Sequence, residues 1–70
     1  MNQHTTRACN IAKSLGLRHK PMVFLSELAA RRFASECVKP HRVVMGEHPA
    51  YWVVCPADAS RLERAGYEIV

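Results

Sequence analysis

Several residue patterns that would assign a function are missing from this chain of 70 residues. It has no Gly-rich phosphate loop, no His-Glu-x-x-His motif and no Cys-x-x-Cys pair. Charged residues interrupt every apolar stretch well before the roughly 20 residues that a membrane-spanning helix needs. The first residues also lack the apolar segment of a secretory signal. We therefore expect a soluble, cytoplasmic protein that does not contact a membrane.

The chain is also too short for a two-lobed enzyme. At this size a folded chain buries only about 60% of its unfolded surface, which leaves little material for a dry, preorganised catalytic cleft. Hydrophobic residues make up 49% of the sequence and charged residues 23%, a globular composition. We predict a single small domain over residues 6–70, preceded by disordered residues 1–5, and no enzymatic activity.

Cysteine is scarce and widely spaced. An odd number of cysteines, three, argues against an extracellular disulfide framework and for reduced thiols in a core. A four-ligand metal site could be drawn from Cys37, His41, His48 and Cys55. Structural zinc usually has two closely spaced ligand pairs, whereas His48 and Cys55 are seven residues apart. We predict no metal and no cofactor, although the sequence leaves metal binding by these four side chains open.

Acidic residues are absent from the first twenty positions, which have a net charge of +4. Residues 1–46 have a net charge of +6 and residues 47–70 a net charge of −2, giving +4 overall. Such an uneven distribution steers a protein toward an anionic surface. The surface could be nucleic acid or the acidic face of another protein.

The hydrophobic pattern predicts two helices in the first half of the chain. A short N-terminal helix begins at Thr6 and ends at Gly16, with apolar residues at helical spacing (Ala8, Ile11, Ala12, Leu15). After Pro21 a short apolar run, residues 22–25, is typical of a strand. The main helix is predicted over about residues 26–38, capped by Ser26 and ended by Pro40. Its apolar stripe comprises Ala29, Ala30, Phe33, Ala34, Cys37 and Val38.

The second half of the chain predicts a hairpin over about residues 42–55. Its second strand is apolar on both faces, with Trp52 on one face and Tyr51 on the other, so we expect it in the centre of a sheet. A short C-terminal helix follows, with Ala59, Leu62 and Ala65 facing inward, and it ends at Gly66. A last strand comes after it. The predicted fold class is α+β: a small antiparallel sheet with one main helix packed on it.

Nucleic-acid binding has two possible arrangements. Residues 11–20 resemble the first helix and turn of a helix-turn-helix, with Gly16 at the turn, although Pro21 departs from that pattern. In the other arrangement residues 26–38 form a recognition helix and the hairpin a wing. The nucleic-acid-binding residues would be Arg18, Lys20, Arg31, Arg32 and Arg42.

Protein binding is the interpretation that we favour. Three features favour it: the short basic N-terminal helix, the strand that is apolar on both faces, and the neighbouring aromatic residues Tyr51 and Trp52 in that strand. Aromatic residues and Arg are the residue types that are enriched in protein interfaces. The candidate protein-binding residues are Arg7, Ile11, Lys13, Arg18, Lys20 and Tyr51.

In size, charge and the order of helix and hairpin, the chain resembles the small basic proteins encoded by phages and other mobile elements. Several of these bind host RNA polymerase and alter transcription. The resemblance implies a partner in the host transcription machinery and no chemistry. Our hypothesis is a non-enzymatic regulator, a monomer or weak dimer, that docks on an acidic surface of that partner and acts sterically. The alternative is a DNA-binding transcription regulator.

Overall fold

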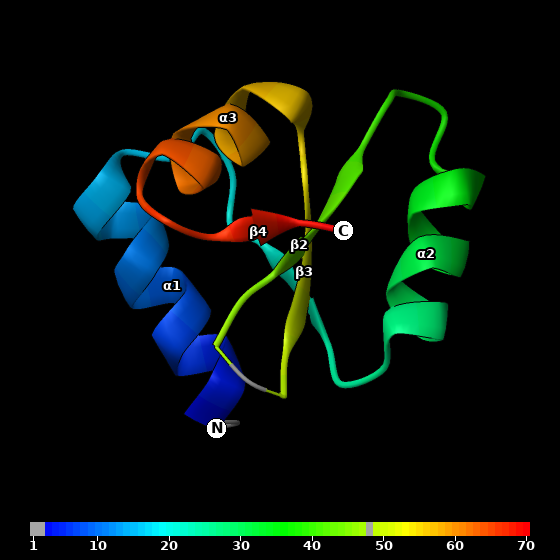
Figure 1. The fold of residues 1–70 in the computed structure, drawn as a ribbon, viewed down its shortest axis with the longest axis horizontal. Coiled ribbons are helices and arrows are strands. Elements are labelled where there is room, and N and C mark those ends of the chain that lie inside the picture. The colour runs from blue at the N-terminus through cyan, green and yellow to red at the C-terminus, as the bar shows by residue number, and fades with distance from the viewer. Residues whose placement is uncertain (1–2, 48) are drawn as a thin grey trace.

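The hairpin predicted near residues 42–55 forms the centre of a four-stranded antiparallel sheet (Figure 1). The computed structural model describes residues 3–47 and 49–70, and in this part of the chain three helices accompany the sheet. The elements are α1 (Gln3–Leu15), β1 (Met22–Phe24), α2 (Glu27–Glu36), β2 (Arg42–Met45), β3 (Tyr51–Val54), α3 (Pro56–Arg64) and β4 (Glu68–Ile69). The predicted α+β class is confirmed.

The strands lie in the order β1-β3-β2-β4, and every neighbouring pair is antiparallel. As a result β1 runs parallel to β2, and β3 runs parallel to β4. Each parallel pair is joined through a helix and is separated by one intervening strand. The two-sided strand predicted to be central, β3, lies between β1 and β2, which confirms that prediction.

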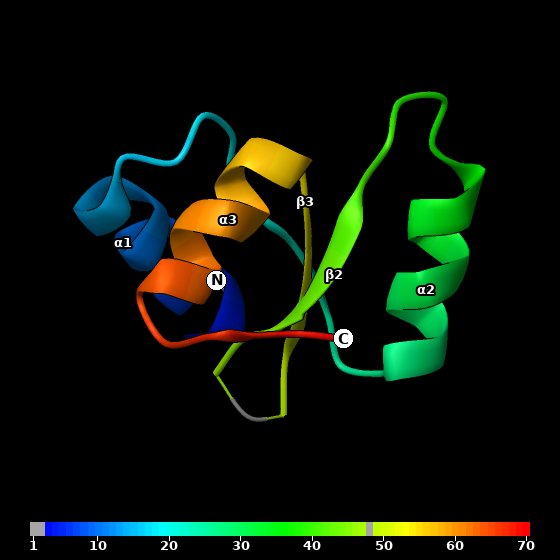
Figure 2. The same ribbon diagram turned by 45° about the horizontal axis from the view of Figure 1, so that its top comes forward.

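The helices cover both faces of the sheet, with α2 on one side and α1 and α3 on the other (Figures 1 and 2). Crossovers between parallel strands are almost always right-handed. Both crossovers advance across the sheet in the same direction, but β3 runs opposite to β1. A right-handed connection therefore places α2 and α3 on opposite faces. One packed helix was expected, and two further helices on the second face complete a three-layer structure.

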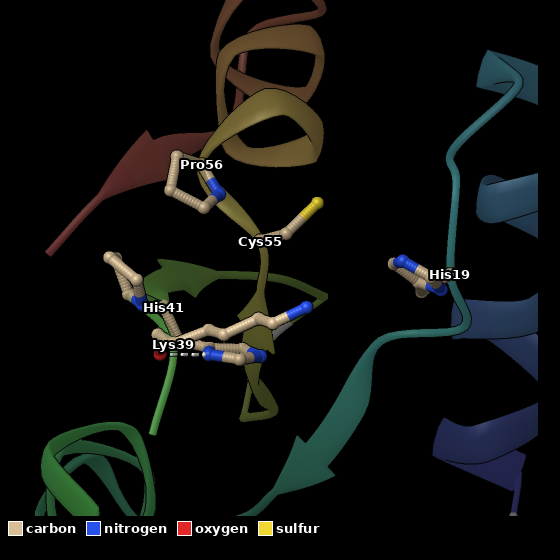
Figure 3. Close-up of a pocket in the computed structure, with 6 residues that line it drawn as sticks. His19, Lys39, His41, Cys55 and Pro56 are labelled. Atoms are coloured by element: carbon tan, nitrogen blue, oxygen red, sulfur yellow. Dashed lines mark hydrogen bonds between the residues drawn. The ribbon is translucent and has the colours of Figure 1, made fainter. Parts of the chain in front are cut away.

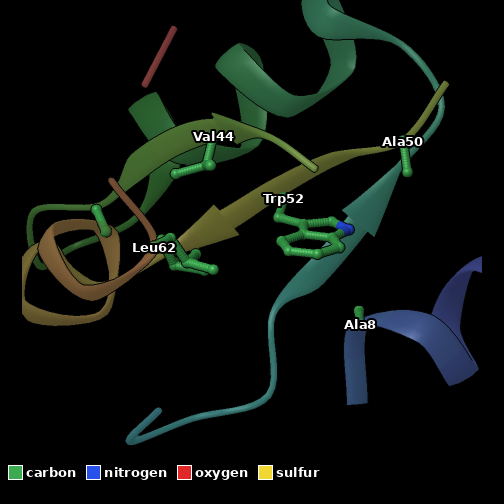
Figure 4. Close-up of a cluster of buried hydrophobic side chains, with 7 residues drawn as sticks. Ala8, Val44, Ala50, Trp52 and Leu62 are labelled. Atoms are coloured by element: carbon green, nitrogen blue, oxygen red, sulfur yellow. The ribbon is translucent and has the colours of Figure 1, made fainter. Parts of the chain in front are cut away.

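Alternation along β3 divides the core into two clusters. Trp52 and Val54 pack with Val44 and Leu62 on the face covered by α1 and α3 (Figure 4). Val53 and Tyr51 face α2, where the cluster also contains Ala30, Val43, Phe24 and Phe33. Trp52 is completely buried, as expected for the core of a small sheet.

The end of α1 matches the sequence pattern, and its beginning does not. Gly16 has a φ of 67°, and the N–H of Leu17 donates to the carbonyl of Ala12 at 2.9 Å, the bond that closes a Schellman motif. The helix begins at Gln3, three residues before the predicted start at Thr6. Polar residues give no hydrophobic period from which a helix start can be read. Residues 1 and 2 lie outside the described residues.

The predicted apolar faces of α2 and α3 include residues that are exposed in the structure. The predicted cap is present in α2, where Ser26 Oγ accepts from the N–H of Ala29 at 3.3 Å. However, α2 ends at Glu36, because the backbone of Cys37 is already extended, with a ψ of 138°, and Val38 is fully exposed. Ala29, also assigned to the stripe, is exposed. In α3 Ala65 is the exposed C-cap residue rather than an inward-facing one.

Candidate functional site

The loops that enter β1 and β2 meet at one end of the sheet, where β3 also ends. This follows from the topology, since β1 and β2 begin at the end at which the antiparallel β3 terminates. The loop before β1, residues 16–21, contains Arg18, His19 and Lys20. The loop before β2, residues 37–41, contains Lys39 and His41.

A buried carboxylate fixes the first of these loops. Asp58, in the first turn of α3, is completely buried. Its Oδ1 accepts from the backbone N–H of Arg18 at 2.8 Å, and its Oδ2 accepts from the backbone N–H of His19 at 3.1 Å. Both carboxylate oxygens therefore bind the loop, and the Arg18 side chain stays exposed to solvent.

Two adjoining hollows lie at this end, and His19 lines both. The larger has a volume of about 480 Å³ and separates His19 from the 37–41 loop, with Cys55 between them (Figure 3). We call it the His19–His41 groove; it is lined by His19, Lys39, Pro40, His41, Cys55 and Pro56. The smaller, of about 170 Å³, is lined by Cys9, Ala12, Lys13, Leu17, Arg18, His19 and Lys20.

The 37–41 loop also has an internal hydrogen bond. His41 Nδ1 lies 2.8 Å from the carbonyl oxygen of Lys39. Because a carbonyl oxygen only accepts, Nδ1 is the donor in this pair. This bond holds the imidazole against its own loop at the wall of the groove.

Cations dominate this end of the molecule. We call it the basic end; its cations are Lys13, Arg18, Lys20, Lys39 and Arg42. Arg42 belongs to it because it lies opposite Val54, one residue before Cys55. In the described part of the chain the two ion pairs are Arg7–Glu47 and Arg31–Glu27, and neither involves a residue of the basic end.

The predicted protein-binding residues separate into two groups. Lys13, Arg18 and Lys20 come together around the smaller hollow. Arg7 pairs with Glu47 of the β2–β3 turn, at the other end of the sheet. Ile11 is half-buried against the core, and Tyr51 is half-buried on the face covered by α2.

Neither predicted arrangement for reading DNA has the expected geometry. After Gly16 the chain forms a loop and then β1, so the second helix of a helix-turn-helix is absent from residues 18–25. The hairpin is not a free wing, since β1 and β4 flank it on both sides. Of the residues proposed for DNA contact, Arg31 and Arg32 are exposed on α2, whereas Arg18, Lys20 and Arg42 lie at the basic end.

Three of the four side chains considered as metal ligands, Cys37, His41 and Cys55, are described, and they do not form a cluster that could hold a metal ion. Within residues 3–47 and 49–70, no three His, Cys, Asp or Glu side chains are placed to hold a metal ion. Cys37 Sγ donates to the carbonyl of Phe33 at 3.3 Å. His48 lies outside the described residues. His41 and Cys55 both line the His19–His41 groove.

Three residues of this site were not singled out as binding residues from the sequence. Lys39 lies next to the end of one predicted helix and Asp58 near the start of another, where a charge of that sign has an ordinary structural reason. His19 had no local signal. A residue between two cations in a loop after a Gly stop could have suggested His19, but nothing local connects Asp58 to a loop 40 residues away.

Comparisons with protein-family models, with curated proteins and with solved structures find no match to this chain. In addition, no helix among the described residues is long and apolar enough to cross a membrane. The function must therefore be argued from the geometry of the basic end.

Proposed function

We propose that the protein is a non-enzymatic binding module that docks its basic end on an acidic surface of a large macromolecular partner. One observation supports this most directly. Cations from two loops that are far apart in the sequence lie at one end of the sheet, Lys39 at the His19–His41 groove and Arg18 and Lys20 at the adjoining smaller hollow, and no carboxylate lines either hollow. The ion pairs of Arg7 and Arg31, by contrast, neutralise cations elsewhere on the molecule.

Docking would combine long-range attraction with a preformed surface. Clustered cations accelerate encounter with an anionic partner and orient it. The loop bearing Arg18 and Lys20 is held by Asp58 through two backbone hydrogen bonds. A loop that is already ordered loses little conformational entropy on binding, which favours affinity. Occupying the partner's surface would then block other contacts sterically.

The partner that we propose to test first is the host transcription machinery, RNA polymerase in particular. The support for this choice is the resemblance of the chain to small basic phage-encoded regulators in size, charge and element order. The protein would inhibit or modulate the polymerase by covering one of its acidic surfaces.

Phosphates of nucleic acid would also attract these cations. A protein surface is favoured over single-stranded nucleic acid because no Phe, Trp or Tyr side chain lines either hollow, which leaves only the imidazoles of His19 and His41 as rings on which bases could stack. The aromatic side chains are instead half-buried or buried in the two core clusters: Phe24, Phe33, Tyr51, Trp52 and Tyr67.

An affinity capture from host lysate tests the proposal. The immobilised wild-type protein is compared with the double variant Arg18→Glu/Lys20→Glu and with the control Arg32→Glu/Arg61→Glu. Both double variants change the net charge equally, but Arg32 and Arg61 lie on exposed faces of α2 and α3. We expect the first variant to lose the partner and the control to retain it. The captured protein is then purified and titrated directly.

A salt titration with random duplex DNA tests the alternative. Binding through phosphates would weaken steeply as salt increases. If the duplex binds and Arg18→Glu/Lys20→Glu abolishes this binding, the ligand of the basic end is DNA and not a protein. If neither the lysate partner nor duplex DNA depends on Arg18 and Lys20, the proposed function is wrong.

A further inference from the structure

The His19–His41 groove combines apolar walls with positive charge. Pro40, Pro56 and the Cys55 thiol provide apolar surface, and Lys39 provides an ammonium group. No carboxylate lines the groove, so an anionic side chain entering it would meet the Lys39 ammonium group, and the Asp58 carboxylate behind the His19 wall is completely buried and bonded to backbone N–H groups. A ligand that satisfies both features carries carboxylates and apolar side chains together.

The shape of the site also restricts the ligand. A volume of about 480 Å³ suits a few side chains or a small molecule. A nucleic-acid duplex presents convex rows of phosphates, which several protruding cations contact, whereas this groove is a recess lined by one ammonium group, two imidazoles and apolar side chains. An extended peptide can place individual side chains in such a hollow while its backbone runs across the rim.

The walls of the groove are held in place before any ligand binds. The backbone N–H of His19 donates to Asp58 at 3.1 Å, and His41 Nδ1 donates to the Lys39 carbonyl at 2.8 Å. Cys55 lies where β3 passes into α3, next to Pro56, whose ring restricts the backbone. Three separate elements thus present a fixed recess.

From this geometry we propose that the His19–His41 groove binds an extended acidic and apolar segment of a partner protein. This inference rests on the proposed function and names the part of the partner that the basic end recognises. Carboxylates of the segment contact Lys39 and the neighbouring cations. An apolar side chain of the segment packs against Pro40 and Pro56.

The three thiols of the protein provide a direct test. Cys55 lines the groove, whereas Cys37 does not and has its Sγ bonded to the Phe33 carbonyl. Alkylation by iodoacetamide is followed at each cysteine by mass spectrometry, with and without a short synthetic peptide of Glu and Leu. At a peptide concentration ten times the Kd, a covered thiol should react about tenfold more slowly. We expect that protection at Cys55 and an unchanged rate at Cys37.

Three other ligands define the specificity. Peptides with Gln in place of Glu, or with Glu alone, should not protect Cys55 at the same concentration, and random duplex DNA should not protect it. Lys39→Glu should weaken binding of the Glu and Leu peptide at least about fivefold, while Arg32→Glu leaves it unchanged. Equal protection by polyglutamate, or protection by duplex DNA, would overturn the inference.

The outcome also separates this inference from the proposed function. If the peptide binds by fluorescence anisotropy and leaves Cys55 fully reactive, the groove is not its site, and the inference is wrong. The proposed function would then be decided separately, by whether capture of the partner depends on Arg18 and Lys20. If the peptide does not bind at all, the inference is wrong on that ground alone.

Discussion

The backbone N–H of Arg18 donates to Oδ1 of Asp58 at 2.8 Å, so a buried carboxylate of α3 holds the loop that presents the basic end. The adjacent N–H of His19 donates to the other oxygen of the same carboxylate. An acidic residue thereby organises a cationic surface without forming an ion pair with its side chains. The bond is between backbone and carboxylate, and the Arg18 side chain remains directed to solvent.

Replacing Asp58 should therefore affect both stability and docking. Asp58→Ala leaves two backbone donors without their acceptor, and we expect it to lower the free energy of unfolding by about 2–4 kcal/mol. Asp58→Asn keeps one acceptor oxygen and should cost less. Urea unfolding followed by circular dichroism measures both values. A loss below about 0.5 kcal/mol for Asp58→Ala would show that the loop does not depend on this carboxylate.

Gly46 and Trp52 provide a test of the core. A Cβ at Gly46 would overlap the indole ring of Trp52, which is completely buried. Since the ring has no room to shift, we expect Gly46→Ala to destabilise the protein by about 1–3 kcal/mol. Thermal unfolding followed by tryptophan fluorescence reports the change. The control Ser14→Ala, exposed on α1, should leave the midpoint unchanged.

Tyr67 predicts a stability change at alkaline pH. Burial raises the pKa of the Tyr67 hydroxyl, Glu47 raises it further, and Arg7 opposes them. The folded protein therefore keeps this proton at a pH where the unfolded chain has lost it. The contribution of the protonated Tyr67 hydroxyl to the free energy of unfolding is complete below about pH 10, the ordinary pKa of tyrosine. It is lost as the pH rises through the pKa of Tyr67 in the folded protein.

Urea unfolding between about pH 9 and 11 measures this effect. The wild type should lose stability more steeply with pH than Tyr67→Phe, which has no hydroxyl to titrate. Tyr67 lies beside Trp52, with ring centroids 5.3 Å apart, so the phenyl ring of the variant keeps that contact. Parallel curves for the two proteins would contradict the prediction.

Arg7 should matter little to stability. Its ion pair with Glu47 is exposed at both side chains, and exposed pairs contribute less than about 1 kcal/mol. We expect Arg7→Gln to change the free energy of unfolding by under that amount, with a smaller effect at high salt. Urea unfolding at two salt concentrations measures it. A loss of several kcal/mol would mean that this pair anchors α1.

Much of the fold could be predicted from the sequence because its signals are local. The caps of α1 and α2, the alternation along β3 and the turn between β2 and β3 each depend on a few neighbouring residues. The placement of α3 on the second face could not be predicted, since it follows from strand order and crossover handedness, and α1 packs on the same face through core contacts that are distant in the sequence. Strand order is a long-range property that no local pattern contains.

The candidate site was predicted only in part for the same reason. Lys13, Arg18 and Lys20 are close in sequence, and the uneven charge pointed to them. Lys39 joins them because β1 and β2 are parallel and their entry loops meet at one end. Arg7 is equally basic and equally near the N-terminus, yet α1 carries it to the opposite end.

The sharpest test of the basic end compares Lys39 with Arg7 in binding to the purified partner obtained by affinity capture. Each residue is replaced by Glu, which changes the net charge equally, and the Kd is measured by titration. A surface assembled from both loops predicts that Lys39→Glu weakens binding at least about fivefold, roughly 1 kcal/mol, and that Arg7→Glu leaves it unchanged. If Arg7→Glu weakens binding and Lys39→Glu does not, the partner recognises the N-terminal helix, and the basic end is not the docking surface.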